Sequence, residues 1–212
     1  MLNYKIHALF NSMPRFRWNM IDHVGFADGI YIVFEDGETY RDMDRIVRVG
    51  THNSGGRLRV RLKNHFVGES KDGSIFRKNV GKAILNKGEN PYLKIWNKNS
   101  SKKSDMANVA GYDPALQKSI EITVSEYMRD HFTFACFPVK TKAERLRLEE
   151  GIIAVLNNAS ECFASSTWLG RNSPEVEIAK SGLWLKRGLD GVPLTELEFA
   201  NIEAYCASIL SH

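Results

Sequence analysis

Hydrophobic and polar positions along the chain follow two kinds of pattern, and the first kind predicts a small sheet. Residues 29–35 (GIYIVFE) are rich in β-branched and aromatic side chains, and an Asp-Gly pair at 36–37 is a common turn signal. Residues 45–49 (RIVRV) and 132–139 (FTFACFPV) predict two further strands. Successive side chains of a strand point to opposite faces, so Tyr31 and Val33 share one face of the first strand while Ile30 and Ile32 point the other way.

The second kind of pattern has the period of a helix. In residues 57–66 (RLRVRLKNHF), apolar side chains recur at every fourth position and cationic ones occupy the neighbouring ridge. The apolar members are Leu58, Leu62 and Phe66, and the cationic members are Arg57, Arg61 and His65. We therefore expect a short amphipathic helix with one cationic face.

Three more helices are predicted at residues 119–130, 142–157 and 194–210. Thr141 has the position and chemistry of an N-cap for the second of them, and Glu144 completes a capping box. Strands and helices of these lengths predict an α+β fold, with a small antiparallel or mixed β-sheet flanked by helices.

Composition narrows the class of protein. The 212 residues are 43% hydrophobic and 25% charged, and no stretch approaches the roughly 18 apolar residues of a membrane helix. The first ten residues do not have the pattern of a secretory signal, so we expect a cytoplasmic protein without a membrane partner. Cys136, Cys162 and Cys206 are far apart in sequence and are expected to be core thiols.

The charge is unevenly distributed. The whole chain carries a formal net charge of +4, but residues 45–103 contain fifteen Lys or Arg and only three Asp or Glu, a local charge of +12. Such a block favours an anionic partner, nucleic acid before membrane, although a solvated basic surface would have the same composition.

Glu149 stands out on the predicted helix 142–157, because it falls within the apolar arc of that helix. An ionised carboxylate on an apolar face is costly unless it is paired or binds a metal. A salt bridge with Arg145, which lies in the same arc, and a metal site are both open readings of this position.

Two other elements contain candidate polar chemistry. Arg61 and His65 lie one helical turn apart, where a guanidinium can hold a phosphate and an imidazole can move a proton. A solvated basic helix face would also explain this pair. Tyr31 shares a strand face with Val33, a position at which a tyrosine commonly packs in the core.

Taken in order along the chain, these segments resemble the GIY-YIG nuclease superfamily. Residues 29–31 are Gly-Ile-Tyr, and residues 48–50 (Arg-Val-Gly) stand where the family has Tyr-Ile-Gly or Tyr-Val-Gly. Residues 61–66 match the basic helix of the family, and Glu149 is followed by Ile at the third and fourth positions after it. Residues 168–184 (WLGRNSPEVEIAKSGLW) are similar to a segment of stand-alone bacterial members.

The resemblance implies a metal-dependent endonuclease that hydrolyses DNA phosphodiester bonds. By this resemblance Glu149 would hold Mg²⁺ or Mn²⁺, and Arg61 would offset charge on the phosphoryl oxygens. Tyr31, with help from His65, would position or deprotonate the attacking water. The family often has an asparagine as an additional site residue. Asn172 is the first candidate for it and Asn157 is the second.

The positions at which the sequence departs from the family pattern also lead to expectations about the structure. Sixteen residues separate Tyr31 from Arg48, so we expect an enlarged turn at residues 36–44. An arginine cannot act as a general base at neutral pH, so Arg48 is expected to hold a phosphate instead. The further candidates for nucleic-acid contacts are Arg57, Lys63, Lys98, Lys102 and Lys103, the last three in a polar basic loop at 97–105.

The resemblance also divides the chain. We expect an N-terminal extension at 1–24, a GIY-YIG-like catalytic domain at 25–184 with an insertion around 68–133, and a helical tail at 185–212 packed on the same domain. The expected partner is DNA rather than RNA, and a homodimer would allow both strands to be cut. The alternative function is a catalytically weak or inactive nucleic-acid-binding protein, because Arg48 replaces the second tyrosine. An enzyme acting on a small molecule would leave the basic block unexplained.

Overall fold

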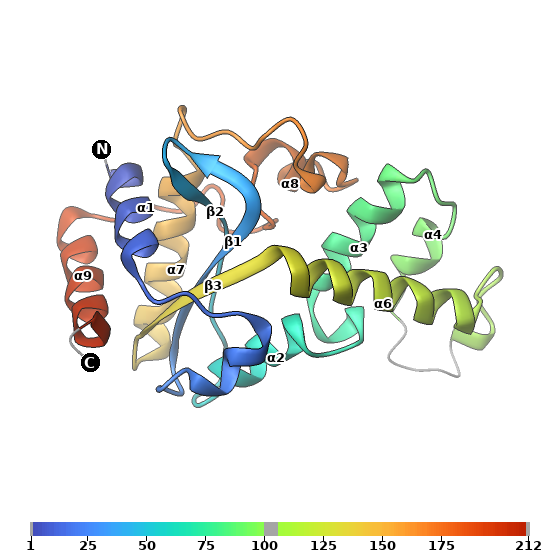
Figure 1. Cartoon of the computed structure of the whole chain (residues 1–212), viewed down its shortest axis with the longest axis horizontal. Helices are drawn as coiled ribbons and strands as arrows, with labels where there is room; N and C mark the ends of the chain where they lie inside the picture. Colours follow the sequence, from blue (N-terminus) through green and yellow to red (C-terminus); the bar gives the residue numbers. More distant parts are fainter. Residues whose placement is uncertain (1, 100–105, 211–212) are drawn as a thin grey trace.

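The computed structural model describes residues 2–99 and 106–210 and has a three-stranded antiparallel sheet flanked by helices (Figure 1). The strands are β1 (Gly29–Tyr40), β2 (Met43–Gly50) and β3 (Phe132–Pro138), in the order β2-β1-β3. The predicted α+β class is confirmed. Because β1 is central, it pairs with a neighbour on each side, and the β2 edge is where the chain leaves the sheet toward α2 (Leu58–Phe66).

The β1–β2 hairpin differs from the enlarged turn that the sequence predicts at 36–44. Tyr40 pairs with Met43, so the connection is a tight turn of two residues. The extra residues lie within β1, where the pairing register shifts between Phe34 and Thr39 and where Gly37 has a φ of 85°. The expectation was wrong because Glu38 and Tyr40 are buried within the fold, so these residues continue β1 and do not form an enlarged exposed turn.

The strongly periodic helices were predicted correctly. α2 and α7 (Lys142–Asn157) occupy the expected residues, and the Thr141 side chain caps α7 by accepting from the amide of Glu144 at 3.3 Å. α6 (Pro114–His131) begins five residues earlier than predicted, because Asp113 caps it and proline occupies its first turn. The last helix, α9, spans Glu196–Leu210.

Other helical segments were not predicted from the sequence. The α-helices are α1 (Leu2–Ser12), α3 (Ile75–Lys87), α4 (Leu93–Trp96) and α8 (Val176–Ser181), and the 3₁₀ turns are η1 (Trp18–His23), η2 (Lys71–Gly73) and η3 (Leu169–Asn172). Ser74 caps α3 by accepting from the amide of Arg77. Arg77, Asn79 and Lys82 are nevertheless buried in α3, which obscures the amphipathic pattern.

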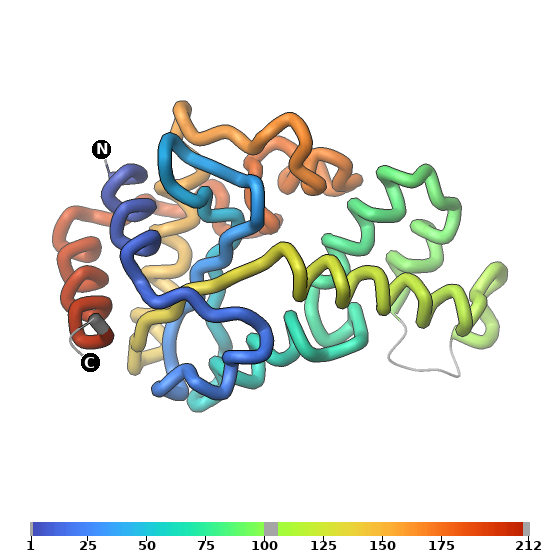
Figure 2. The backbone as a smooth tube through the Cα atoms, viewed as in Figure 1, coloured from blue at the N-terminus to red at the C-terminus, as the bar shows by residue number. Residues whose placement is uncertain are grey.

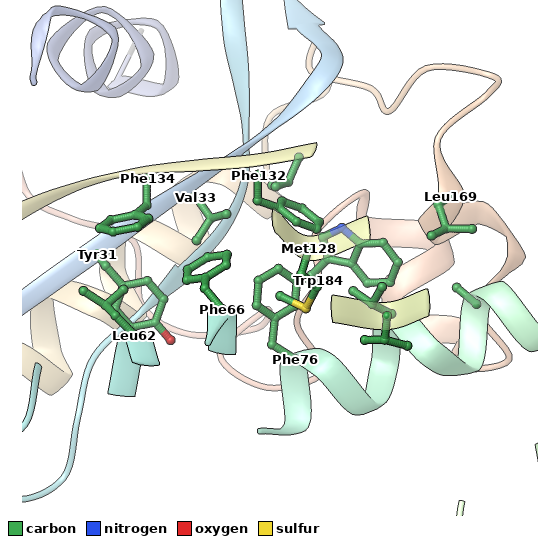
Figure 3. Packing of buried hydrophobic residues seen from close by; sticks show 14 of the residues in the cluster. Tyr31, Val33, Leu62, Phe66, Phe76, Met128, Phe132, Phe134, Leu169 and Trp184 are labelled. Atoms are coloured by element: carbon green, nitrogen blue, oxygen red, sulfur yellow. The ribbon is translucent and has the colours of Figure 1, made fainter. Parts of the chain in front are cut away.

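The sheet is buried on both faces. Tyr31 and Val33 belong to the core on the side of α2, α3 and α6. Figure 3 shows Tyr31 beside Leu62 and Phe66, from which aromatic packing continues to Phe76 and Trp184. The core on the opposite face contains alternate β1 residues and apolar residues of α1, α7 and α9.

Both ends of the described chain pack on this second core. Ile6 and Phe10 of α1 and Phe199 and Ile202 of α9 are all buried in it. The two helices lie next to each other at the same side of the molecule in Figure 2, and Lys5 of α1 donates to Glu196 of α9 at 2.9 Å. Residues before and after the nuclease-like segment therefore share its core.

A buried carboxylate in β1 holds the segment near residues 168–184 against the sheet. Glu35 is 4% exposed, and its Oε2 accepts from the indole nitrogens of Trp168 at 2.7 Å and Trp184 at 2.8 Å. The Tyr127 hydroxyl donates to Oε1. Burial raises the pKa of Glu35, while these three donors oppose the shift by favouring the charged form.

A second buried carboxylate three residues further along extends this network. Glu38 forms an ion pair with Arg45 at 2.6 Å, and it accepts from the Ser165 amide at 3.1 Å. Arg45 also donates to the carbonyl of Gly182 at 2.6 Å. The irregular part of β1 therefore fixes a segment from the other end of the sequence.

Replacement of one indole donor should destabilise the fold. In Trp168→Phe the Glu35 carboxylate loses a donor while remaining buried, which should lower the free energy of unfolding by about 1–3 kcal/mol. Urea denaturation monitored by circular dichroism would measure this change. Trp18→Phe is the control because Trp18 is 37% exposed, and a change there should stay within about 0.5 kcal/mol. Equal losses in the two variants would contradict a special role for the Glu35 network.

Candidate active site

The centre of β1 and helix α2 bring Tyr31 and His65 into contact. The Tyr31 hydroxyl lies 2.7 Å from Nε2 of His65, and both side chains are fully buried. The other ring nitrogen of His65, Nδ1, lies 2.6 Å from the hydroxyl of Ser74. The phenol, imidazole and serine hydroxyl thus form a continuous chain of hydrogen bonds under the surface.

The surroundings of His65 keep its imidazole neutral. Burial places the pKa of His65 well below its ordinary value of 6.5, and the charges of Arg48, Arg61 and Arg77 lower it further. The Nε2 atom of a neutral imidazole can accept a hydrogen bond from the Tyr31 hydroxyl or donate one to it, depending on the tautomer.

Gly50 lies directly over the Tyr31 hydroxyl. The two residues pair across β1 and β2, and a Cβ added to Gly50 would lie 2.2 Å from the hydroxyl oxygen. A side chain at Gly50 would therefore overlap the phenol of Tyr31, which is itself packed in the core. The close passage of β2 over Tyr31 explains why this strand ends in glycine.

Glu149 approaches the same end of β2 from the opposite face of the sheet. Its Oε1 accepts from the amide of Thr51 at 3.1 Å, and the side chain is half-buried. Burial raises the pKa of Glu149, whereas the charge of Arg48, the Thr51 amide and the charge of Arg61 lower it. The two arginines are therefore close enough to act electrostatically on this carboxylate.

The salt bridge that the sequence left open for Glu149 is not formed. Arg145 lies 3.3 Å from Asp28 and donates to the carbonyls of Val139 and Lys140. Its guanidinium ties the start of α7 to the end of β3 and to the residue before β1. Arg145 therefore does not neutralise the charge of Glu149, whose hydrogen-bond donor is the Thr51 amide.

The two residues of the contact between Thr51 and Glu149 line different pockets, Thr51 the first and Glu149 the second. The first, which we call the basic pocket, has a volume of about 250 Å³. Its lining is polar apart from Val60 and includes Thr51, His52, Arg57, Arg61 and Asn64. The second, which we call the Trp184 pocket, has a volume of about 530 Å³ and is lined by Glu149, Arg48, Asn79 and several apolar residues around Trp184.

A family model for the GIY-YIG domain matches residues 20–192, which is most of the chain. The chain belongs to the GIY-YIG family. Searches of curated proteins and of solved structures gave no match. No described helix has the length and apolarity to cross a membrane. Membership supports nuclease-type activity on phosphodiester bonds at the level of the family.

Arg48, at the position of the second family tyrosine, lies inside the protein. It is 5% exposed, donates to the carbonyl of Trp184, and stacks over the ring of Phe76 at 4.8 Å. Its Nε has no hydrogen-bond partner among the described residues. The structure thus places this arginine at the wall of the Trp184 pocket and not on an open DNA-facing surface.

The other described residues predicted to contact nucleic acid lie at the surface. Arg57 is exposed at the start of α2, Lys63 pairs with Asp22 at 2.6 Å, and Lys98 is exposed after α4. Lys102 and Lys103 lie outside the described residues. These positions remain predictions of nucleic-acid contacts.

The structure does not bring the predicted asparagine to Glu149. Asn172 donates to the carbonyl of Leu169 at 3.3 Å, and neither Asn172 nor Asn157 is among the described residues lining the two pockets. Asn79 of α3 does line the Trp184 pocket. Asn79 could not be predicted from the sequence, because it lies in a helix with no clear apolar period.

The donor set near Glu149 fits a hydrated divalent ion. Among the described residues no group of three His, Cys, Asp or Glu side chains could enclose a metal. Glu149 supplies one carboxylate, of which Oε1 already accepts from an amide. Mg²⁺ is bound in this manner, through one or two carboxylates with water and substrate phosphate.

The neutral state of His65 can be measured by titration. Because burial disfavours the imidazolium, we expect the His65 ring signals in NMR to remain those of neutral imidazole as the pH falls through 6.5. In urea-unfolded protein the same ring should titrate at about 6.5. The folded protein binds fewer protons in this window, so its stability should fall as the pH drops below 6.5. A folded-state titration near 6.5 would contradict the enclosed site.

Gly50→Ala should disrupt the Tyr31–His65 contact. A Cβ 2.2 Å from the phenol oxygen forces the strand or the ring to move, which should lower the free energy of unfolding by about 1–3 kcal/mol. Gly25→Ala is the matched control, since a Cβ there meets no described atom within 4 Å. Thermal and urea unfolding would report both variants. If Gly50→Ala were as stable as Gly25→Ala, the close approach would be wrong.

Proposed function

We propose that this protein is a metal-dependent endonuclease that hydrolyses DNA phosphodiester bonds. The observation that carries the proposal is the contact of the Glu149 carboxylate with the Thr51 amide at the end of β2, because Thr51 also lines the basic pocket together with Arg61. Membership of a nuclease family supports the same reaction class. The proposed catalytic unit is residues 25–184, with residues 68–133 as an insertion.

Each charged residue of the site has a different role at the scissile phosphate. Glu149 would hold Mg²⁺ or Mn²⁺ by its carboxylate, beside the Thr51 amide. When bound, the ion polarises the phosphate and stabilises the leaving oxygen. Arg61 offsets negative charge on the phosphoryl oxygens, and Arg57, on the same ridge of α2, binds a neighbouring phosphate.

Tyr31 and His65 are the proposed acceptors for the proton that the attacking water loses. The phenol orients the attacking water, and the neutral imidazole accepts the proton through the 2.7 Å contact. Both side chains are enclosed, so the backbone at Gly50 must shift when substrate binds. Ser74 keeps the imidazole ring in place through Nδ1.

DNA is the proposed substrate because of the positive charge of residues 45–103. Lys63 and Lys98, together with the basic loop in which Lys98 lies, would contact backbone phosphates away from the cut. The proposed location is the cytoplasm, and two copies of the chain would together cut both strands. Asn172 remains a proposed supporting residue on the family resemblance alone, since it lines neither of the two pockets.

The second candidate is a protein that binds nucleic acid without cutting it. Two observations favour it: Arg48 occupies the place of the second tyrosine, and the Tyr31 hydroxyl is closed off from solvent. The basic pocket would then bind phosphate without supporting hydrolysis. This candidate and the nuclease differ in one measurable property, which is strand cleavage.

Plasmid cleavage with Mg²⁺ or Mn²⁺ tests the proposal. The wild-type protein should nick or linearise DNA, and Glu149→Gln and Arg61→Gln should each reduce the rate by about 10²–10³-fold because each removes charge that stabilises the transition state. Glu144→Gln is the matched control on the same helix. The Glu144 carboxylate accepts from Tyr205, which a glutamine oxygen can also do, so the rate should be unchanged.

The alternatives give different results in this assay. If Glu149→Gln cut as well as the wild type, the metal role of Glu149 would be wrong. If the wild type bound DNA in a salt-sensitive manner without cleaving linear, nicked, branched or single-stranded substrates, the binding protein would be the correct function.

A further inference from the structure

Residues 185–192 lie along α7, the helix that contains the proposed metal ligand. Asn157, the last residue of the helix, donates to the carbonyl of Leu189 at 3.0 Å. Arg147, in the first half of the helix, donates to the carbonyl of Val192 at 2.8 Å. Both acceptors belong to the main chain, so α7 holds the backbone of this segment independently of the side chains that the segment carries.

Two glycines allow the same segment to approach the helix closely. Gly188 has a φ of 79°, a conformation that favours glycine, and a Cβ added there would lie 3.3 Å from Cδ1 of Ile153. A Cβ added to Gly191 would lie 2.5 Å from Cγ of Glu150. The backbone directly after Arg187 is therefore fixed against α7.

This fixed backbone presents the Arg187 side chain at the surface. Arg187 is exposed and lines the Trp184 pocket together with Glu149. It forms no hydrogen bond or ion pair with another described residue. The other two cations of the pocket are engaged, because Lys186 pairs with Glu175 at 2.5 Å and Arg48 donates to a backbone carbonyl. Among the described cations of this pocket, Arg187 is the one available to bind an anion.

The charge of the Trp184 pocket favours an anion. Its lining contains three cations and two carboxylates, which gives a net charge of +1. A divalent ion on Glu149 would raise this charge to +3. An arginine side chain binds phosphate with two parallel hydrogen bonds, so the guanidinium of Arg187 suits a phosphate group of the backbone of DNA.

Glu149 connects the linings of two pockets that contain cations. Its carboxylate accepts from the amide of Thr51, which lines the basic pocket with Arg57 and Arg61. Glu149 itself lines the Trp184 pocket with Arg187. The two pockets have no lining residue in common, so each would bind its own phosphate. A DNA strand that crosses Glu149 would then place one phosphate in each pocket.

We propose that Arg187 binds a backbone phosphate of the cleaved strand, on the other side of the cut from the basic pocket. This inference rests on the proposed function and extends its site beyond residues 25–184, although still within the residues 20–192 that the family model matches. The scissile phosphate would have a bound phosphate on each side. The preferred substrate is therefore a strand that continues in both directions from the cut, and not a strand end.

The salt dependence of DNA binding tests the charge of Arg187 without catalysis. The full-length protein is titrated in EDTA into a labelled duplex at salt concentrations from about 50 to about 200 mM, where each phosphate contact contributes about 0.9 to the slope of log K against log salt. Arg187→Gln should reduce the magnitude of this slope by about 0.9, and Arg187→Lys should retain it, because lysine keeps the charge.

Arg41→Gln is the matched control, since it removes the same charge from a different part of the surface. Arg41 is exposed in the β1–β2 turn, at the other end of β2 from the Thr51 contact, and it lines neither of the two pockets. The slope should be unchanged in this variant. Since Arg187 has no described partner, both Arg187 variants should keep the circular dichroism spectrum of the wild type.

Neutral linkages locate the contact on the DNA. Single phosphates on either side of a mapped cleavage site are replaced by methylphosphonates, which have no charge. In the wild type, a neutral linkage at the phosphate bound by Arg187 should weaken binding by about tenfold. Arg187→Gln should bind this DNA and the unmodified DNA equally, while neutral linkages on the other side of the cut should still weaken its binding.

The outcomes separate this inference from the proposed function. An unchanged salt slope in Arg187→Gln, or full sensitivity of this variant to every neutral linkage, would overturn the assignment to Arg187. Absence of any DNA binding by the wild type, with or without a divalent ion, would refute the proposed function itself. An unchanged slope in Arg187→Gln together with cleavage that needs Glu149 would leave the nuclease proposal intact and remove only the Arg187 contact.

Discussion

A buried carboxylate must have hydrogen-bond donors, and this requirement at Glu35 connects the two ends of the sequence. Its donors, Trp168 and Trp184, lie 133 and 149 residues further along the chain. The neighbouring pair of Glu38 and Arg45 fixes the same distant segment. Because Trp184 walls the pocket beside Glu149 and its carbonyl holds Arg48, the geometry of the site depends on these buried carboxylates.

Elements whose pattern is local could be predicted from the sequence. The alternation around Tyr31 and the fourfold repeat around His65 each follow from the face that the element buries, and the structure has both elements where they were expected. The cap at Thr141 was equally visible, since a capping box lies within four residues. Arg61 and Glu149 belong to such elements, so the helices that contain them could be predicted, whereas their placement in one site was implied only by the family resemblance.

Features that depend on distant partners could not be predicted. Residues 36–40 have the composition of a turn, but the buried carboxylates of Glu35 and Glu38 find donors in another part of the chain, so the stretch forms an irregular continuation of β1. Lys82 is buried in α3 because Glu175 pairs with it, and Arg77 because Glu121 does. Asn79 was missed for the same reason: periodicity places a polar residue of a helix at the surface, whereas α3 is enclosed.

The central claim is that Glu149 is the ligand of a divalent ion beside Arg61. Crystals of the protein soaked in MnCl₂ would test it by anomalous scattering, which locates manganese without reference to activity. We expect an anomalous peak at the Glu149 carboxylate that is absent from Glu149→Gln crystals treated in the same way. A manganese peak elsewhere with none at Glu149, or a peak that persists at this position in Glu149→Gln, would contradict it.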